Sequence, residues 1–155
     1  MNQQPFSFRA ARKTDLSAIV RLLADDDLGQ SRENPTLPLA GAYLDAFQAI
    51  ADDANQILAV ATNPENAVIG TIQITLIPGI SRRGAWRGQI EAVRVARDYR
   101  GSGLGQSMLE WAITQCRLKG CSLIQLTTDK SRPDAHRFYE KLGFEASHLG
   151  YKLNL

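Results

Sequence analysis

A glycine-rich loop between a predicted strand and a predicted helix constrains the fold more than any other feature of this sequence. The loop spans residues 101–105 (GSGLG) and follows an alternating, β-branched segment at residues 89–95. A helix is expected from about residue 103 to residue 119, followed by a strand at residues 122–127. The apolar stripe expected on this helix consists of Met108, Leu109, Ala112, Ile113 and Cys116. A strand–helix–strand unit of this kind joins two parallel strands by a right-handed crossover. The chain is therefore expected to contain at least one parallel strand pair.

The other segments complete a mixed sheet with helices on it. Apolar residues at helical spacing follow Thr14 and Pro38, and Ser131-x-x-Asp134 resembles a capping box that opens a last helix. Further strands are expected at residues 6–10, 56–62, 67–77 and 151–155. The predicted class is α/β, with a mostly antiparallel central sheet, one splayed parallel strand pair and about four flanking helices.

Length and composition restrict the class of protein that this chain can be. Its 155 residues are expected to form a single domain, residues 1–155, and its 44% apolar and 22% charged residues exclude a wholly disordered or collagen-like chain. No uncharged stretch is long enough to cross a bilayer, and residues 1–13 hold no apolar run typical of a signal peptide. We therefore expect a cytoplasmic protein with no membrane partner.

Charge and cysteine content exclude further classes. The 18 basic and 16 acidic residues give a net charge of +2, which is too balanced to indicate a nucleic-acid partner. Cys116 and Cys121 lie five positions apart, which fits neither a CxxC redox motif nor a zinc site, and the chain has two histidines. We expect no metal and two reduced thiols.

The glycine loop is suited to binding an anion. Backbone amides at the N-terminus of a helix are unpaired, and the helix dipole adds positive charge there. Arg100 beside the loop can add a bidentate contact, and Arg97 is near. Gly105 is followed by Gln106 rather than Lys, so the loop is no nucleotide P-loop, and its GxGxG spacing is not the dinucleotide fingerprint. The alternative is that the glycines serve only tight packing.

Two sequence blocks together resemble the GNAT family of acetyl-CoA-dependent N-acetyltransferases. Arg100-x-x-Gly103-x-Gly105 matches the family's pyrophosphate signature, Q/R-x-x-G-x-G/A. Residues 135–144 (AHRFYEKLGF) match its second block, A-x-x-F-Y-x-x-x-G-F, in the expected order along the chain. The element order of the whole chain also fits this family.

The resemblance implies roles for individual residues. The backbone of Val93 and Val95 would contact the pantetheine arm of acetyl-CoA, between two strands that splay apart. Tyr139 matches the family tyrosine near the thioester sulfur, a frequent general acid. The pyrophosphate would be held by Arg100, Gly101, Ser102, Gly103, Leu104, Gly105 and Gln106. Many family members carry an Asn at the position of Arg132, and the contact of that Asn with the cofactor is not expected here. The Arg132 side chain either reaches a phosphate or is solvated.

Acetyl transfer to an amine needs a base, an oxyanion donor and an acid. Glu91 lies two residues before Val93 and so faces the same side of the strand, which makes it the candidate base; the alternative is an ion pair with Arg94 or a neighbouring strand. The Val93 amide is the candidate oxyanion donor. A phenol is only slightly less acidic than a thiol, so Tyr139 can protonate the leaving thiolate; its alternative is a place in an ordinary apolar stripe.

The predicted function is transfer of an acetyl group from acetyl-CoA to a primary amine of a small molecule or peptide. The alternative is a catalytically silent acyl-CoA-binding sensor or interaction domain. Arg82, Arg83 and Arg87 would guide an acidic acceptor or the cofactor's phosphates, or be solvated. Residues 25–27 (DDD) either attract a cationic amine or form a solvated helix end. The sequence leaves the acceptor and a homodimer through an exposed sheet edge open.

Overall fold

The computed structural model describes residues 6–155. The chain forms two compact units, Met1–Gln125 and Leu126–Leu155. The prediction that no signal peptide begins the chain rests partly on residues 1–5, which lie outside the described residues. Each unit is described by itself below.

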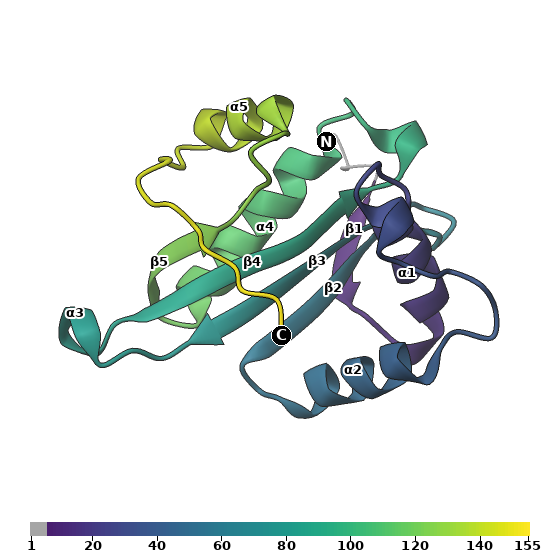
Figure 1. Cartoon of the computed structure of the whole chain (residues 1–155), viewed down its shortest axis with the longest axis horizontal. Coiled ribbons are helices and arrows are strands. Elements are labelled where there is room, and N and C mark those ends of the chain that lie inside the picture. Colours follow the sequence, from purple (N-terminus) through teal and green to yellow (C-terminus); the bar gives the residue numbers. More distant parts are fainter. Residues whose placement is uncertain (1–5) are drawn as a thin grey trace. The chain divides into compact units, whose positions relative to one another are not determined.

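The first unit is built on an open five-stranded sheet, with the strands in sequence order from β1 to β5 (Figure 1). The first four strands pair antiparallel, and β4 and β5 are parallel, as the strand–helix–strand pattern predicted. The predicted fold class is therefore confirmed. The strands are β1 (Ser7–Ala10), β2 (Gln56–Thr62), β3 (Val68–Ile77), β4 (Trp86–Val95) and β5 (Cys121–Leu126).

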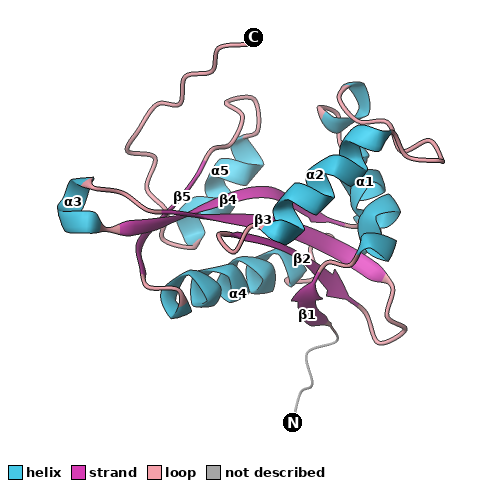
Figure 2. Cartoon of the chain, turned by 90° about the horizontal axis from the view of Figure 1, so that it is seen from below, coloured by secondary structure: helices cyan, strands magenta, loops and turns pink. Residues whose placement is uncertain are grey.

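Helix α4 (Leu104–Leu118) covers one face of the sheet, and α1 (Leu16–Ala24) and α2 (Gly41–Asp52) lie on the other (Figure 2). The core under α4 joins strand isoleucines to one stripe of the helix: Ile72, Ile74, Ile90, Met108, Leu109, Ala112 and Cys116 are all at most 2% exposed. Gly88 allows the close approach, because a Cβ there would lie 2.4 Å from the Cys116 sulfur. The predicted face of α4 is thus confirmed.

Short turns connect these elements. They are η1 (Lys13–Asp15), η2 (Gly29–Ser31), α3 (Ser81–Gly84) and η3 (Arg97–Tyr99). In α3 the backbone of Arg82 and Arg83 is left-handed, with φ of 55° and 62°. Helix α2 begins at Gly41 rather than at Pro38, and none of its residues is buried.

A buried carboxylate fixes the start of α1. Asp15 is 8% exposed; it receives two hydrogen bonds from Arg9, at 2.6 and 3.0 Å, and one from the Arg12 amide at 2.7 Å. The hydrogen bond from Arg9 lowers the pKa of Asp15 below its usual range. Asp15, rather than Thr14, therefore accepts the hydrogen bonds that hold the chain at the start of α1.

Because its pKa is lower in the folded protein, Asp15 contributes stability above its unfolded pKa, and that stability is lost as pH falls through the folded pKa. Asp15→Asn is expected to lower the free energy of unfolding at pH 7 by about 2–3 kcal/mol. The deficit should shrink as the pH falls below about 4, the unfolded pKa of an aspartate, and disappear only below the lower folded pKa, where the wild-type carboxylate is itself protonated. Denaturant unfolding from pH 3 to 7 checks this, with Asp45→Asn on the exposed side of α2 as control; a pH-independent deficit would contradict it.

The second unit contains α5 (Pro133–Lys141), which Gly143 follows with a left-handed φ of 88°. The predicted capping box is wrong. Ser131 does not cap the helix, because its amide and hydroxyl both bind the Asp129 carboxylate, at 2.9 and 2.7 Å, and Arg132 takes the N-cap position.

The predicted strand at residues 151–155 is also wrong. No strand forms there, and Tyr151, Leu153 and Leu155 are 86–116% exposed. Alternating apolar residues favour a strand only where a partner strand supplies the ladder of hydrogen bonds, and a five-residue sequence cannot provide that partner.

Candidate active site

The glycine loop joins the end of β4 to α4 in the conformation that glycine favours. Gly101 and Gly103 have φ of 78° and 87°, and Gly103 is the N-cap of α4. A Cβ on either residue would meet no atom within 4 Å, whereas Leu104 is fully buried and anchors the loop to the core. Leu104 therefore anchors the loop to the core, while its glycines Gly101 and Gly103 border open space.

Several loop amides have no acceptor within residues 6–155, namely those of Gly101, Gly103, Gly105 and Gln106. Ser102 organises the turn instead, because its hydroxyl donates to the Tyr99 carbonyl at 2.6 Å. The Gln106 side chain donates to Glu110 at 2.8 Å, whereas its backbone amide is unpaired. Unpaired amides at the positive end of a helix dipole provide an anion site.

The two arginines near the loop are bound within the protein. Arg97 donates to the Asp25 carboxylate at 2.8 Å. Arg100 donates to the other carboxylate oxygen at 3.1 Å, to the Asp25 carbonyl at 2.9 Å and to the Val95 carbonyl at 3.2 Å. The Arg100 side chain therefore ties the loop to the ends of α1 and β4. No local sequence signal could reveal this, because Asp25 lies more than 70 residues earlier.

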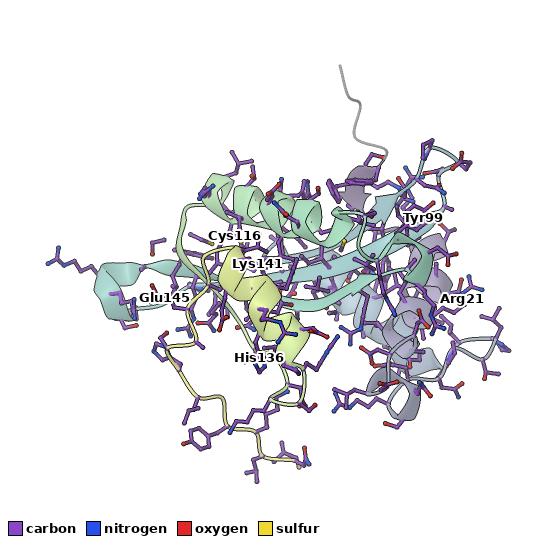
Figure 3. All side chains as sticks on the ribbon, turned by 90° about the horizontal axis from the view of Figure 1, so that it is seen from above. Arg21, Tyr99, Cys116, His136, Lys141 and Glu145 are labelled. Carbon is purple, nitrogen blue, oxygen red and sulfur yellow. The ribbon has the colours of Figure 1, made fainter. Side chains whose placement is uncertain are left out.

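Asp25 and Arg97 also line an open recess of about 370 Å³ beside the loop. Arg21 and Val68 contribute to the same recess, and Figure 3 shows Arg21 on α1 and Tyr99 near the loop. The recess thus carries two arginines and one carboxylate. Within residues 6–155 no cluster of three or more His, Cys, Asp or Glu side chains is placed to hold a metal ion.

Asp26 and Arg94 form an ion pair at 3.0 Å that joins the end of α1 to β4. This leaves Glu91 without an ion-pair partner among the described residues, so the expected alternative of a Glu91–Arg94 pair is not formed. The Glu91 side chain is exposed. The acidic run at residues 25–27 is therefore not simply a solvated helix end, because two of its three carboxylates bind arginines from β4 and the loop.

A β-bulge interrupts β4 directly after Glu91. Gln73 of β3 pairs with Glu91, and Thr71 pairs with Arg94, so two residues of β4, Ala92 and Val93, stand opposite one residue of β3. Ala92 has a left-handed φ of 52°. An extra residue breaks the ladder, bends the strand and re-aims neighbouring groups, and such bulges are common beside active sites. The register puts the side chain of Arg94, rather than that of Val93, on the same face as Glu91, so the expectation that Glu91 and Val93 share a face is wrong. The sequence offered no signal for it, because the strained residue is not a glycine.

Ala92→Gly is expected to raise the free energy of unfolding by about 0.5–1 kcal/mol. Glycine removes the left-handed strain of about 1–2 kcal/mol, and the gain is partly offset by its larger unfolded-state entropy. The matched control is Ala96→Gly at an ordinary φ of −55°, which should lose about 0.4–1 kcal/mol. Denaturant unfolding measures both; equal losses in the two variants would show that Ala92 is not strained.

Tyr139 lies on α5 in the second unit. Its ring makes edge-to-face contacts with Phe138 and Phe144, at centroid distances of 5.3 and 5.9 Å, and it is half-buried. Tyr139 therefore lies in a small aromatic cluster of the second unit. Arg132 is exposed at the N-cap of the same helix.

The comparisons with known proteins agree with this fold. Residues 18–144 match the model of the Acetyltransferase (GNAT) family. The chain is 33% identical to glucosamine 6-phosphate N-acetyltransferase of Trypanosoma brucei brucei, over 95% of this chain and 94% of that protein. It is 32% identical to aminoalkylphosphonate N-acetyltransferase of Salmonella typhimurium, over 71% and 70% of the two chains.

Among solved structures, the chain is similar to that of a transcriptional regulator from Bacillus halodurans C-125. The TM-score is 0.93 at 47% identity, covering 97% of this chain and 99% of that one. The chain belongs to the GNAT acetyltransferase family, whose members use acetyl-CoA and an amine acceptor. No helix within residues 6–155 is long and apolar enough to span a membrane.

Proposed function

We propose that this chain transfers the acetyl group of acetyl-CoA to a primary amine of a small molecule or peptide. The observation that carries the proposal is the set of unpaired amides in the loop at the N-terminus of α4, directly after a strand with a bulge at Ala92. Residues Arg100–Gln106 would hold the pyrophosphate, mainly through their backbone. Val93 and Val95 would bind the pantetheine arm through backbone groups.

The chemistry is direct attack of the amine on the thioester. The nitrogen lone pair forms a bond to the carbonyl carbon, and the π electrons move to the oxygen, which the Val93 amide stabilises. Glu91, directly or through a water, accepts a proton from the nitrogen. The carbonyl then re-forms, the C–S bond breaks with its electron pair on sulfur, and Tyr139 protonates the thiolate to give CoA. Bulk water then takes the proton from Glu91 and reprotonates Tyr139.

We propose further that residues 1–155 act as a single N-acetyltransferase domain, since the family match runs through both compact units. Its two free cysteines fit a reducing, cytoplasmic compartment. A homodimer, and the expected lack of nucleic-acid and membrane partners, stay predictions.

Ligand-induced thermal stabilisation tests the cofactor. Acetyl-CoA and CoA should raise the unfolding temperature, whereas ATP and NAD should not, because only a ligand that binds the folded state stabilises it. Stabilisation by ATP or NAD alone would overturn the proposal. Release of free thiol with a panel of amines then tests turnover. The panel includes glucosamine 6-phosphate and aminoalkylphosphonates, the acceptors that name two relatives, and peptide amines.

One observation favours a second function, that of an acyl-CoA-binding sensor without turnover. The 47% identical protein of known structure is described as a transcriptional regulator. A sensor would be stabilised by acetyl-CoA and yet release no thiol with any amine. The presence of both Glu91 and Tyr139 favours the enzyme, because a sensor needs neither.

A further inference from the structure

A row of polar side chains crosses four strands of the sheet. Gln56 of β2 pairs with Thr75 of β3, and Thr75 pairs with Gln89 of β4. Gln89 in turn accepts a hydrogen bond from Gln125 of β5 at 2.7 Å. The Gln56 side-chain oxygen accepts from Thr75 at 3.0 Å, so the row is connected at both ends.

Gln73 extends this row. It lies two residues before Thr75, so it faces the same side of the sheet, and it donates to Gln56 at 3.1 Å. This face is opposite to the one that packs on α4, because Ile74, Ile90 and Gly88 occupy the alternate positions. We call the set Gln56, Gln73, Thr75, Gln89 and Gln125 the glutamine surface.

The glutamine surface lies on the sheet face that also carries α1 and α2 (Figure 2), so it is not an ordinary solvated face. All five side chains are half-buried rather than exposed, and none carries a charge, whereas the solvent face of a sheet is commonly rich in exposed polar and charged groups. Four of the chain's ten glutamines are gathered on it.

Its hydrogen bonds leave both donors and acceptors available. Within residues 6–155 the amide nitrogens of Gln56 and Gln89 find no acceptor, and the amide oxygens of Gln73 and Gln125 find no donor. A hydroxyl group both donates and accepts, so neighbouring hydroxyls on one carbon skeleton match this mixture. None of these five side chains is cationic, so they do not by themselves provide a site for a phosphoryl group.

The glutamine surface adjoins the candidate chemistry. Gln73 pairs with Glu91, and Gln89 is two residues before Glu91 on the same face of β4. At about 3.3 Å per residue, Gln89 lies about 13 Å before Val93 along β4. Glu91, which pairs with Gln73, lies about 7 Å before Val93. That length accommodates one sugar-sized ring next to the candidate base.

We propose that the glutamine surface binds the hydroxylated skeleton of the acceptor, so that the acceptor is an amino sugar or a similar polyhydroxylated amine. This inference rests on the proposed function. The surface selects among amines by hydroxyl groups, because a half-buried amide left without its partner penalises an acceptor that lacks them.

Two variants and two amines test the inference. Gln73→Met and Gln89→Met keep the length of the side chain and remove its amide. Each should raise the KM for glucosamine at least about 10-fold, since one lost hydrogen bond in a partly buried site is worth about 1.4 kcal/mol. The kcat/KM for cyclohexylamine, which has no hydroxyl, and the KM for acetyl-CoA should stay within about two-fold. Comparing each amine with itself across variants cancels the different basicities of the two amines.

Gln48→Met is the control, because it removes an exposed glutamine of α2 that binds Asp52. If the two variants lose activity equally with glucosamine and with cyclohexylamine, the inference is overturned. A wild-type preference for peptide amines over glucosamine would also overturn it. Calorimetric titration of glucosamine into the protein saturated with CoA tests binding where no reaction occurs. Weaker binding in the two variants supports the glutamine surface even if no amine is acetylated, in which case only the proposed function fails. Binding that is absent in the wild type or unchanged in the variants overturns the inference.

Discussion

Gly103→Val is expected to weaken acetyl-CoA binding at least about 100-fold. The wild-type residue has a φ of 87°, and a Cβ there would meet no protein atom within 4 Å. A valine side chain would occupy the space that a pyrophosphate needs and shift a backbone that L-residues adopt at a cost of about 1–2 kcal/mol. Losing two charge-assisted amide bonds, each worth about 1.5–3 kcal/mol, gives the expected fold-change. Calorimetric titration with acetyl-CoA measures it.

The matched control is Gly120→Val. Gly120 also has a left-handed φ of 78° and open space at its Cβ, but it follows the opposite end of α4. Both variants should lose similar stability, and only Gly103→Val should lose the cofactor. If Gly120→Val weakens acetyl-CoA binding to the same extent, the loss reflects strain in α4 and not the loop, and the assignment of the pyrophosphate site is wrong.

The sequence predicted the elements whose signals are local. The period of the apolar residues located α4, and its buried stripe agrees with that expected from Met108 to Cys116. The same holds for the parallel pair of β4 and β5, which the crossover rule requires once α4 lies between them. Glycine spacing located the loop, because glycine is the residue that adopts a positive φ at low cost.

Features that depend on distant partners could not be predicted. Asp25 binds Arg97 and Arg100 across more than 70 residues, and nothing in an acidic run at a helix end indicates that its partners lie beside the glycine loop. The strand expected at residues 151–155 has the right alternation but lacks a partner strand. The Ala92 bulge depends on a register shift between two strands, which the composition of neither strand reveals.

Asp25 also changes the expected role of the arginines near the loop. Arg100 makes two of its bonds to backbone carbonyls, so its side chain orders the loop, and the proposed anion site consists of the backbone amides. These contacts are partly exposed, and such ion pairs contribute little to stability. Their effect is therefore on the position of the loop rather than on the stability of the fold.

Tyr139→Phe is expected to lower kcat about 10²- to 10³-fold, within the range that a positioned general acid contributes. The substitution keeps the ring, and hence the edge-to-face contacts with Phe138 and Phe144, and it removes only the hydroxyl. The affinity for acetyl-CoA should therefore stay within about two-fold of the wild type. Steady-state rates with the best amine of the panel, measured from pH 6.5 to 9, check the expectation.

Tyr151→Phe is the control, because this tyrosine of the same unit is 90% exposed and stands outside both sequence blocks of the family. Its rates should equal those of the wild type. A kcat for Tyr139→Phe that matches the wild type across the whole pH range would remove Tyr139 from the mechanism. The thiolate would then leave without protein assistance, and the aromatic contacts of Tyr139 would account for its place on α5. If instead kcat falls while binding and stability hold, the hydroxyl acts on the reaction itself, because the packing of the ring is the same in both proteins.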